Sequence, residues 1–292
     1  MGSYDNYYYK DDEQMAIYIA DLICASLSIL GCCFILILCV FFPNLRRLPF
    51  RMIIYLTISD LGSSIAFALP YYKSYAICQA QGYMSSYFSL SSIMWSACIS
   101  HAIKSTIIDG IEVEKNVKKY FFISFFLPSL CFLVLFDIKE YKLALGWCWI
   151  YLNETMDSEF YRQIVYRFIT YYVPLCFVIG FILYNYWKIS RVLKDSESLF
   201  ENENKVAKAM ILKLKLYPVI LILSMLPVII MRMVSLGWLP GWELTLVSGI
   251  GLGLNGFLNS VVYGLTQEVK IELRKLCKSG KSERSSSLVE VG

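Results

Sequence analysis

Seven long apolar runs, separated by short segments that contain turn formers or charges, constrain the fold of this chain more than any other feature. Each run is long enough, as a helix, to cross a hydrocarbon core about 30 Å thick. The chain of 292 residues is 57% hydrophobic and 17% charged, whereas soluble domains are about 45–50% apolar and about 25% charged. The pattern predicts an all-α membrane protein built as a bundle of seven transmembrane helices. The seven runs cover residues 15–42, 52–72, 78–108, 120–136, 162–189, 210–236 and 244–265.

The apolar runs divide the chain into four parts. Residues 1–14 form a short, acidic, tyrosine-rich tail, and residues 15–266 form the bundle. Residues 267–279 alternate apolar and basic side chains, a pattern typical of an amphipathic helix that lies in the membrane–water interface. Residues 280–292 are rich in serine and charge, so we expect a disordered tail.

Lysine and arginine are unevenly distributed between the two sides of the predicted membrane. Short loops rich in these residues stay in the cytosol. This rule predicts an extracellular N-terminus and a cytosolic C-terminus for a protein whose spans are surrounded by membrane lipids. The side with more basic residues carries Arg46, Arg47, Arg51, Lys115, Lys118, Lys119, Arg191, Lys194, Lys205 and Lys208, and the other carries only Lys10, Lys73, Lys139, Lys142 and Arg162.

Two of the ten cysteines, Cys78 and Cys148, lie on the predicted outer side. Disulfides persist there, so we expect these two to join the third span to the loop before the fifth, with two unpaired thiols as the alternative. Asn153 begins an Asn-Glu-Thr sequon in the same loop and is the predicted glycosylation site. Cys277, beside the membrane on the inner side, is the predicted palmitoylation site, and an unmodified thiol is the alternative.

Asp60 lies near the middle of the second span, where a charged group is costly. Asn255 and Asn259 of the seventh span lie at a similar depth. Because they are four residues apart, they share one face of their helix. One interpretation is a polar switch that responds to a bound cation or proton. The other is a static set of hydrogen bonds between helices.

Basic side chains gather near the outer ends of the spans. Arg232, Arg167 and Lys73 belong to this group, and Glu243 and Asp21 are the nearby acids. Guanidinium groups bind phosphate and carboxylate through paired hydrogen bonds, so these residues predict a site for an anionic ligand. The alternative is that long basic side chains near helix ends extend to the interface without a ligand.

The third span is unusually polar, with seven serines between positions 85 and 100. Such a helix is expected at the centre of the bundle, against other helices or a wet cavity. His101, the single histidine of the chain, lies toward the inner end of this span. Lys104 lies one turn further in. They are interpreted either as coupling residues or as ordinary packing.

Several short motifs resemble those of G-protein-coupled receptors. The end of the seventh span, with Asn-Gly-Phe at 255–257 and Glu-Leu-Arg-Lys at 272–275, is similar to that of secretin and adhesion receptors. Other segments are similar to the slime-mould cyclic AMP receptor family over nearly the whole chain. These are Ile-Ser-Asp-Leu at 58–61, Trp-Cys-Trp at 147–149, Tyr-Val-Pro at 172–174 and Tyr-Pro at 217–218, together with Arg232. The resemblance implies that the chain senses an extracellular ligand, with cyclic AMP suggested, and activates a heterotrimeric G protein.

Other function classes fit the sequence less well. The seventh span has no lysine to carry retinal, and a single histidine does not make a catalytic metal site. We therefore expect a protein that is not an enzyme, has no cofactor and does not bind nucleic acid. Serines in the tail could be phosphorylated, which would make a receptor kinase and an arrestin-like regulator further partners; a solvated tail without regulation is the alternative. A transporter or channel that uses Asp60 and the polar third span is the alternative function.

Overall fold

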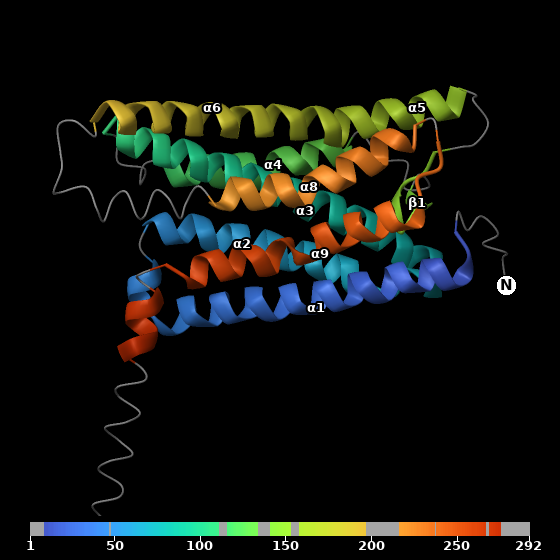
Figure 1. Ribbon diagram of the computed structural model, residues 1–292, viewed down its shortest axis with the longest axis horizontal. Helices are drawn as coiled ribbons and strands as arrows, with labels where there is room; N and C mark the ends of the chain where they lie inside the picture. The colour runs from blue at the N-terminus through green and yellow to red at the C-terminus, as the bar shows by residue number, and fades with distance from the viewer. Residues whose placement is uncertain are drawn as a thin grey trace, which may run out of the picture.

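The computed structural model describes residues 9–46, 48–110, 116–133, 141–152, 158–196, 216–236, 238–266 and 269–275. Within these residues, long helices lie side by side in one elongated bundle, with a small hairpin at the end where α1 begins (Figure 1). The predicted fold class, a seven-helix bundle, is confirmed. The helices are α1 (Asp11–Phe41), α2 (Leu48–Ala68), α3 (Tyr75–Ile108), α4 (Val117–Leu133), α5 (Ser158–Arg167) with α6 (Val173–Ser196), α8 (Leu216–Val234) and α9 (Trp242–Gly264).

Length and hydropathy mark several of these helices as membrane spans. Three described helical segments, Asp11–Phe41, Ser158–Val192 and Trp242–Gly264, are long and apolar enough to cross a membrane. Val219–Val234 is a shorter apolar helix. Large apolar side chains such as Phe41 and Phe177 are 73% and 74% exposed in the isolated chain. Apolar surface of this kind is expected to face lipid rather than water.

Helix α3 occupies the centre of the bundle, as its many serines predict. It packs against α2, α4, α6 and α8, and its serines at 85, 86, 89, 91, 92, 96 and 100 are buried. Hydroxyl pairs join it to α2, where Ser59 meets Ser91 at 2.9 Å and Ser63 meets Ser89 at 3.0 Å. The hydroxyls of these pairs are thus satisfied inside the protein instead of facing lipid, whereas the buried Ser86 hydroxyl has no hydrogen-bond partner among the described residues.

Helices α1 and α9 pack especially closely because α9 has small residues at their contact. A Cβ atom on Gly253 would lie 2.8 Å from the Cβ of Cys24. One turn earlier, a Cβ on Gly249 would overlap the buried carboxyl group of Asp21. The hydroxyl of Ser28 donates to the carbonyl of Gly253 at 2.5 Å and fixes the register of the pair.

The fifth span contains a local change of helix type. The segment η5 (Phe168–Tyr172) is a π-helix between α5 and α6, and the amide of Val173 donates to the carbonyl of Phe168. Pro174 follows directly and cannot donate a backbone hydrogen bond, which explains why the regular α-helical ladder is interrupted here. The wider turn rotates the part of the span before it, including Arg167, relative to the part after it.

The loop before the fifth span contains strands that the sequence analysis did not predict. Strands β1 (Tyr141–Ala144) and β2 (Trp147–Ile150) pair antiparallel, with Tyr141 opposite Ile150 and Ala144 opposite Trp147. All four residues of β2 are buried. This hairpin covers one end of the bundle, the hairpin end. The other end of the helices is the opposite end.

A short helical segment follows the seventh span. Residues 269–275 are helical, and Val269 is fully buried in the cluster that includes Leu45 and Tyr263. Ile271 is 50% exposed. One apolar residue thus faces the bundle and another faces outward.

Candidate functional site

The hairpin is attached to α3 through one face of β2. Cys148 forms the predicted disulfide with Cys78 at the start of α3. Its amide also donates to the side-chain oxygen of Gln81 at 3.0 Å. Because side chains alternate across a strand, Trp147 and Trp149 point to the other face. The Trp-Cys-Trp spacing therefore anchors the hairpin on one side and presents two indole rings on the other.

Arg232 of α8 reaches up to these indole rings from inside the bundle. Its side chain is 1% exposed. The Nη1 atom donates to the carbonyl oxygen of Ala144 at 2.8 Å. The guanidinium carbon lies 4.7 Å from the ring centre of Trp147 and 4.6 Å from that of Trp149. Cation–π contacts of this kind are strongest where water is excluded.

Arg167, at the end of α5, makes the matching contact with the second strand. Its Nε and Nη2 atoms donate to the carbonyl oxygen of Ile150 at 3.0 Å and 2.5 Å. Its guanidinium carbon lies 4.7 Å from the ring centre of Trp149. Two buried arginines from different helices therefore hold main-chain carbonyls of the same hairpin and contact the same indole.

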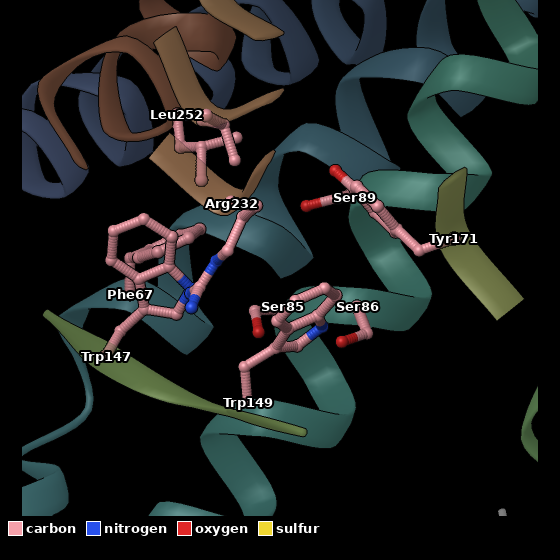
Figure 2. A pocket seen from close by; sticks show the side chains of 10 residues that line it. Phe67, Ser85, Ser86, Ser89, Trp147, Trp149, Tyr171, Arg232 and Leu252 are labelled. Carbon is pink, nitrogen blue, oxygen red and sulfur yellow. The ribbon is translucent and has the colours of Figure 1, made fainter. Parts of the chain in front are cut away.

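A small cavity lies beneath the hairpin (Figure 2). Its volume of about 30 Å³ accommodates two or three water molecules, each of which needs about 10–15 Å³. Figure 2 shows Arg232 entering from α8 toward Trp147 and Trp149, with the α3 serines on the facing side. The cavity combines a cation, aromatic faces and hydroxyl groups. Its lining consists of Phe67, Ser85, Ser86, Ser89, Trp147, Trp149, Tyr171, Val228, Arg232 and Leu252.

The N-terminal segment supports the hairpin tip from the side of α1. The side-chain amide of Gln14 donates to the carbonyl of Gly146 at 3.1 Å and to the hydroxyl of Tyr71 at 2.7 Å. Tyr9 is buried, and its hydroxyl contacts the carbonyl of Pro240 at 3.0 Å and the hydroxyl of Thr245 at 2.7 Å. Sequence reasoning treated the segment before residue 15 as a free tail and did not find these contacts.

A second polar cluster lies at mid-depth and joins α2, α3 and α9. The structure brings Asp60 together with both predicted asparagines. Its Oδ1 accepts from Asn255 at 3.2 Å and its Oδ2 accepts from Asn259 at 2.8 Å. Ser92 of α3 donates to Oδ1 at 2.6 Å and was not predicted as a partner. Asp60 is 2% exposed, so these bonds replace the water that the carboxyl group has lost.

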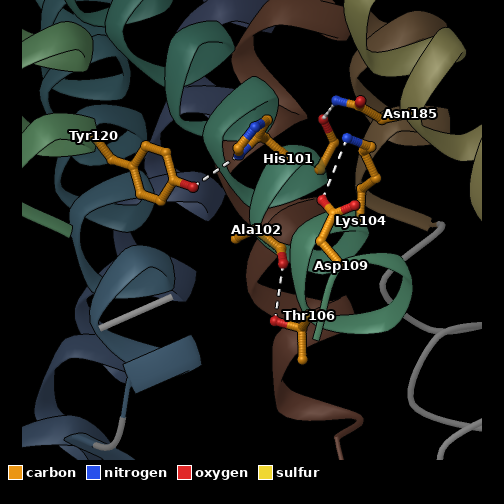
Figure 3. A network of polar contacts seen from close by, with 8 residues as sticks. His101, Ala102, Lys104, Thr106, Asp109, Tyr120 and Asn185 are labelled. Carbon is orange, nitrogen blue, oxygen red and sulfur yellow. Dashed lines mark hydrogen bonds and ion pairs between the residues drawn. The ribbon is translucent and has the colours of Figure 1, made fainter. Parts of the chain in front are cut away.

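A third cluster lies toward the opposite end (Figure 3). His101 Nδ1 lies 2.8 Å from the hydroxyl of Tyr120 on α4, and the imidazole stacks on Phe181 of α6. Lys104 forms an ion pair with Asp109 at 3.5 Å. One turn before Lys104, Ser100 accepts from Asn185 of α6 at 3.1 Å. The end of α3 that lies away from the hairpin is therefore tied to two neighbouring helices, α4 and α6.

The remaining predicted site residues lie elsewhere. Lys73 and Glu243 are exposed and do not line the cavity. Asn153 and Cys277 fall outside the described residues. Asp21 of α1 is 2% exposed, and its Oδ1 has no hydrogen-bond partner within the described parts of the chain.

The bundle has the fold of rhodopsin. The crystal structure of squid rhodopsin matches it with a TM-score of 0.65, covering 89% of this chain and 83% of the other at 17% sequence identity. This likeness defines the class of the fold, a seven-helix bundle that crosses the membrane several times.

Sequence comparison then identifies the family. The family model described as slime mold cyclic AMP receptor matches residues 9–269, and the chain belongs to this family of receptors. G-protein coupled receptor 1 of Arabidopsis thaliana is 26% identical over 84% of this chain and 77% of its own length. Cyclic AMP receptor-like protein A of Dictyostelium discoideum is 29% identical over 83% of this chain and 62% of its own length. The chain is thus a G-protein-coupled receptor by family and is not an enzyme.

Proposed function

We propose that this receptor binds a small anionic ligand at the hairpin end and activates a heterotrimeric G protein at the opposite end. In this proposal the hairpin end is extracellular and the C-terminus is cytosolic in the plasma membrane. The excess of lysine and arginine in the loops of the opposite end supports this orientation. The disulfide at the hairpin end also supports it, because disulfides persist outside the cytosol.

One observation carries the ligand proposal: the buried guanidinium of Arg232 borders a polar cavity beneath the hairpin. A guanidinium favours an anionic partner because its hydrogen bonds to phosphate or carboxylate oxygens join opposite charges and are stronger than those to neutral acceptors. The α3 serines that line the cavity supply hydroxyl groups for polar substituents, and the indoles supply flat apolar faces. The names of the related proteins suggest cyclic AMP as the first ligand to test. Arg167 supports the same site through its contact with Trp149, whereas Lys73 and Glu243 take no part in this proposal.

Signal transmission is proposed to run through two polar clusters, the one around Asp60 and the one around His101 and Lys104. Asp60 joins α2, α3 and α9 through hydrogen bonds that a small shift of any one helix would break. We therefore propose that this cluster acts as a polar switch, and its burial together with these three hydrogen bonds supports the proposal. His101 and Lys104 then fix the inner end of α3. Their rearrangement would change the surface that the G protein contacts.

Modifications and further partners complete the proposal. Asn153 is proposed to carry a glycan on the outer side, and Cys277 a palmitoyl group beside the inner membrane surface. Phosphorylation of the serine-rich tail at 280–292 by a receptor kinase is proposed to recruit an arrestin-like regulator, since each phosphate adds negative charge.

The test is nucleotide exchange on a heterotrimeric G protein co-expressed with the full-length chain. Membranes are treated with cyclic AMP and then with other small phosphates and carboxylates. We expect at least one anion to accelerate exchange in the wild type and to do so much less in Arg232→Gln. If no anion accelerates exchange while proteoliposomes containing the chain show substrate flux, the receptor proposal is wrong and the transporter alternative replaces it.

A further inference from the structure

We propose that the part of α6 near the opposite end binds the headgroup of an anionic phospholipid through Tyr184, Trp187, Lys188 and Arg191. These four residues follow the spacing i, i+3, i+4 and i+7, so they share one side of the helix, the ring–cation face. Neither the ligand cavity nor G-protein coupling enters the proposal. Only the name of the leaflet, cytosolic, rests on the orientation in the proposed function.

The ring–cation face points away from the rest of the bundle. On the other side of the same turns, Ile189 is fully buried and Asn185 donates a hydrogen bond to α3. Tyr184 and Trp187, by contrast, are 49% and 57% exposed, and Arg191 is exposed. Helix α6 runs along one edge of the bundle in Figure 1. The face is therefore directed toward the membrane, away from the other described helices.

Each cation of this face lies over an aromatic ring one turn earlier. The Nζ atom of Lys188 lies 5.2 Å from the ring centre of Tyr184. The guanidinium carbon of Arg191 lies 5.7 Å from the ring centre of Trp187. Cation–π contacts hold the two cations at the level of the rings. A basic side chain that only reaches for water extends past its neighbours into the aqueous phase, so the observed arrangement indicates a preformed site.

The two rings also place this face at the depth of the headgroups. Tyrosine and tryptophan concentrate where the hydrocarbon core meets the headgroups, and these two ring centres are 6.4 Å apart. Toward the middle of the membrane, the same stripe continues with the exposed side chain of Phe177 and with Gly180. A Cβ atom added to Gly180 would meet nothing within 4 Å, so the helix surface is open there.

The length of this stripe matches one leaflet. From Gly180 to Arg191 the helix rises about 16 Å, at about 1.5 Å per residue. Half of a hydrocarbon core about 30 Å thick has nearly the same depth. A phospholipid can thus lay one acyl chain along the open surface at Gly180 while its phosphate reaches Lys188 and Arg191. A soluble phosphate would leave the apolar part of the stripe unused.

The charge of the face selects an anionic lipid. No acidic residue occurs in the sequence between Glu159 and Asp195, and the aromatic rings do not neutralise the charge of Lys188 or Arg191. A guanidinium binds phosphate oxygens through two parallel hydrogen bonds, and an ammonium attracts the same group as a point charge. Each cation near an anionic membrane surface contributes a factor of about five in affinity, so two contribute about thirtyfold. A zwitterionic lipid carries its own cation beside the phosphate and gains much less.

The experiment measures lipid binding to the purified full-length protein in detergent by native mass spectrometry. The probes are phosphatidylserine, phosphatidylcholine and glycerophosphoserine, which is the serine headgroup without acyl chains. The test variant combines Lys188→Gln with Arg191→Gln. The matched control combines Lys118→Gln with Lys119→Gln, which removes the same charge from exposed positions at the start of α4, outside the ring–cation face.

We expect the wild type to bind phosphatidylserine at least about tenfold more tightly than phosphatidylcholine, because both cations act on the net negative charge. The test variant should lose about thirtyfold in affinity for phosphatidylserine, at about fivefold per cation. Its affinity for phosphatidylcholine should stay nearly unchanged. The control variant should lose less than about threefold for phosphatidylserine, because its lysines act only through the general surface potential.

Trp187→Leu tests the role of the ring separately from the charge. It keeps both cations and an apolar side chain but removes the support beneath Arg191. The affinity for phosphatidylserine should therefore fall severalfold, although the net charge of the protein is the same. An unchanged affinity in Trp187→Leu would contradict a preformed site.

Equal losses in the test and control variants would overturn the proposal, because the lipid would then respond only to net charge. Equal binding of phosphatidylserine and phosphatidylcholine to the wild type would overturn it too. Glycerophosphoserine that binds as tightly as phosphatidylserine would replace the lipid with a free phosphate. If the test variant does not fold, Lys188→Gln and Arg191→Gln are measured singly, each with an expected loss of about fivefold; no loss in either counts against the site. Receptor ligand and G protein are both left out, so an inactive receptor would leave these results intact.

Discussion

Replacing Asp60 with leucine tests whether the cluster at mid-depth holds three helices together. Leucine branches at the same carbon as aspartate but is larger and accepts no hydrogen bond. The change removes the acceptor for Ser92, Asn255 and Asn259 at once, and all three of these side chains are buried. The substitution should therefore lower the stability of the bundle.

The expected size follows from the three lost bonds. A hydrogen bond between membrane helices contributes on average about 0.6 kcal/mol and at most about 1.7 kcal/mol. Leaving a buried donor without a partner costs about 1–3 kcal/mol. Three bonds at the interhelical value give a loss of about 2–5 kcal/mol. The unpaired donors place it toward the upper end of this range, and the burial of an apolar side chain reduces it. In a bundle of this size, each kcal/mol corresponds to about 2–4 °C in Tm.

Thermal unfolding of the purified protein in detergent measures this effect. We expect Asp60→Leu to lower Tm by about 4 °C or more. Asp60→Asn should cost less, because an amide still accepts one bond and Asn259 can reverse its own amide to pair with it. Ser64→Ala, one turn away on α2, is the control, since Ser64 bonds only to the Asp60 backbone carbonyl. An unchanged Tm in Asp60→Leu, or an equal loss in Ser64→Ala, would refute the reasoning.

Three further changes test other parts of the structure. Cys148→Ser should destabilise the protein by about 2–4 kcal/mol, because it opens the covalent link to Cys78; a Tm equal to that of the wild type would contradict this. Gly249→Ala should lower Tm by several degrees, because its methyl group would overlap Asp21, whereas Gly180→Ala, with open space around it, should not. His101→Phe should cost about 1 kcal/mol, since it keeps the stacking on Phe181 and loses the bond to Tyr120; thermal unfolding measures it, and a loss no larger than in the exposed control Thr106→Val would be the opposing result.

Much of the fold could be predicted from the sequence because helix spacing and membrane thickness constrain it strongly. The apolar runs located the seven helices, although the structure begins several of them three or four residues earlier. The i, i+4 spacing of Asn255 and Asn259 placed them on one face, and the depth of Asp60 suggested the pairing. The redox argument identified Cys78 and Cys148 as a pair. Each of these inferences uses a single helix or a simple count of residues.

The hairpin and the roles of the arginines could not be predicted in the same way. Each strand has four residues, too few for a period of two to stand out in a polar loop. The carbonyl partners of Arg232 and Arg167 depend on how the hairpin folds over the bundle. Ser92 was one of seven serines between positions 85 and 100, and helix periodicity alone did not distinguish it. These features arise from tertiary contacts, which a pattern in one segment does not contain.

The most direct measurement of the central claim is anion-stimulated nucleotide exchange in vesicles that contain only the purified receptor and a purified heterotrimeric G protein. Cyclic AMP and a panel of small phosphates and carboxylates are the probes, and Arg232→Gln and Lys142→Gln are compared with the wild type. We predict that at least one anion stimulates exchange in the wild type and in Lys142→Gln, and that Arg232→Gln requires a concentration at least about tenfold higher, the factor for one charged hydrogen bond. Equal potency in Arg232→Gln and the wild type would contradict the account.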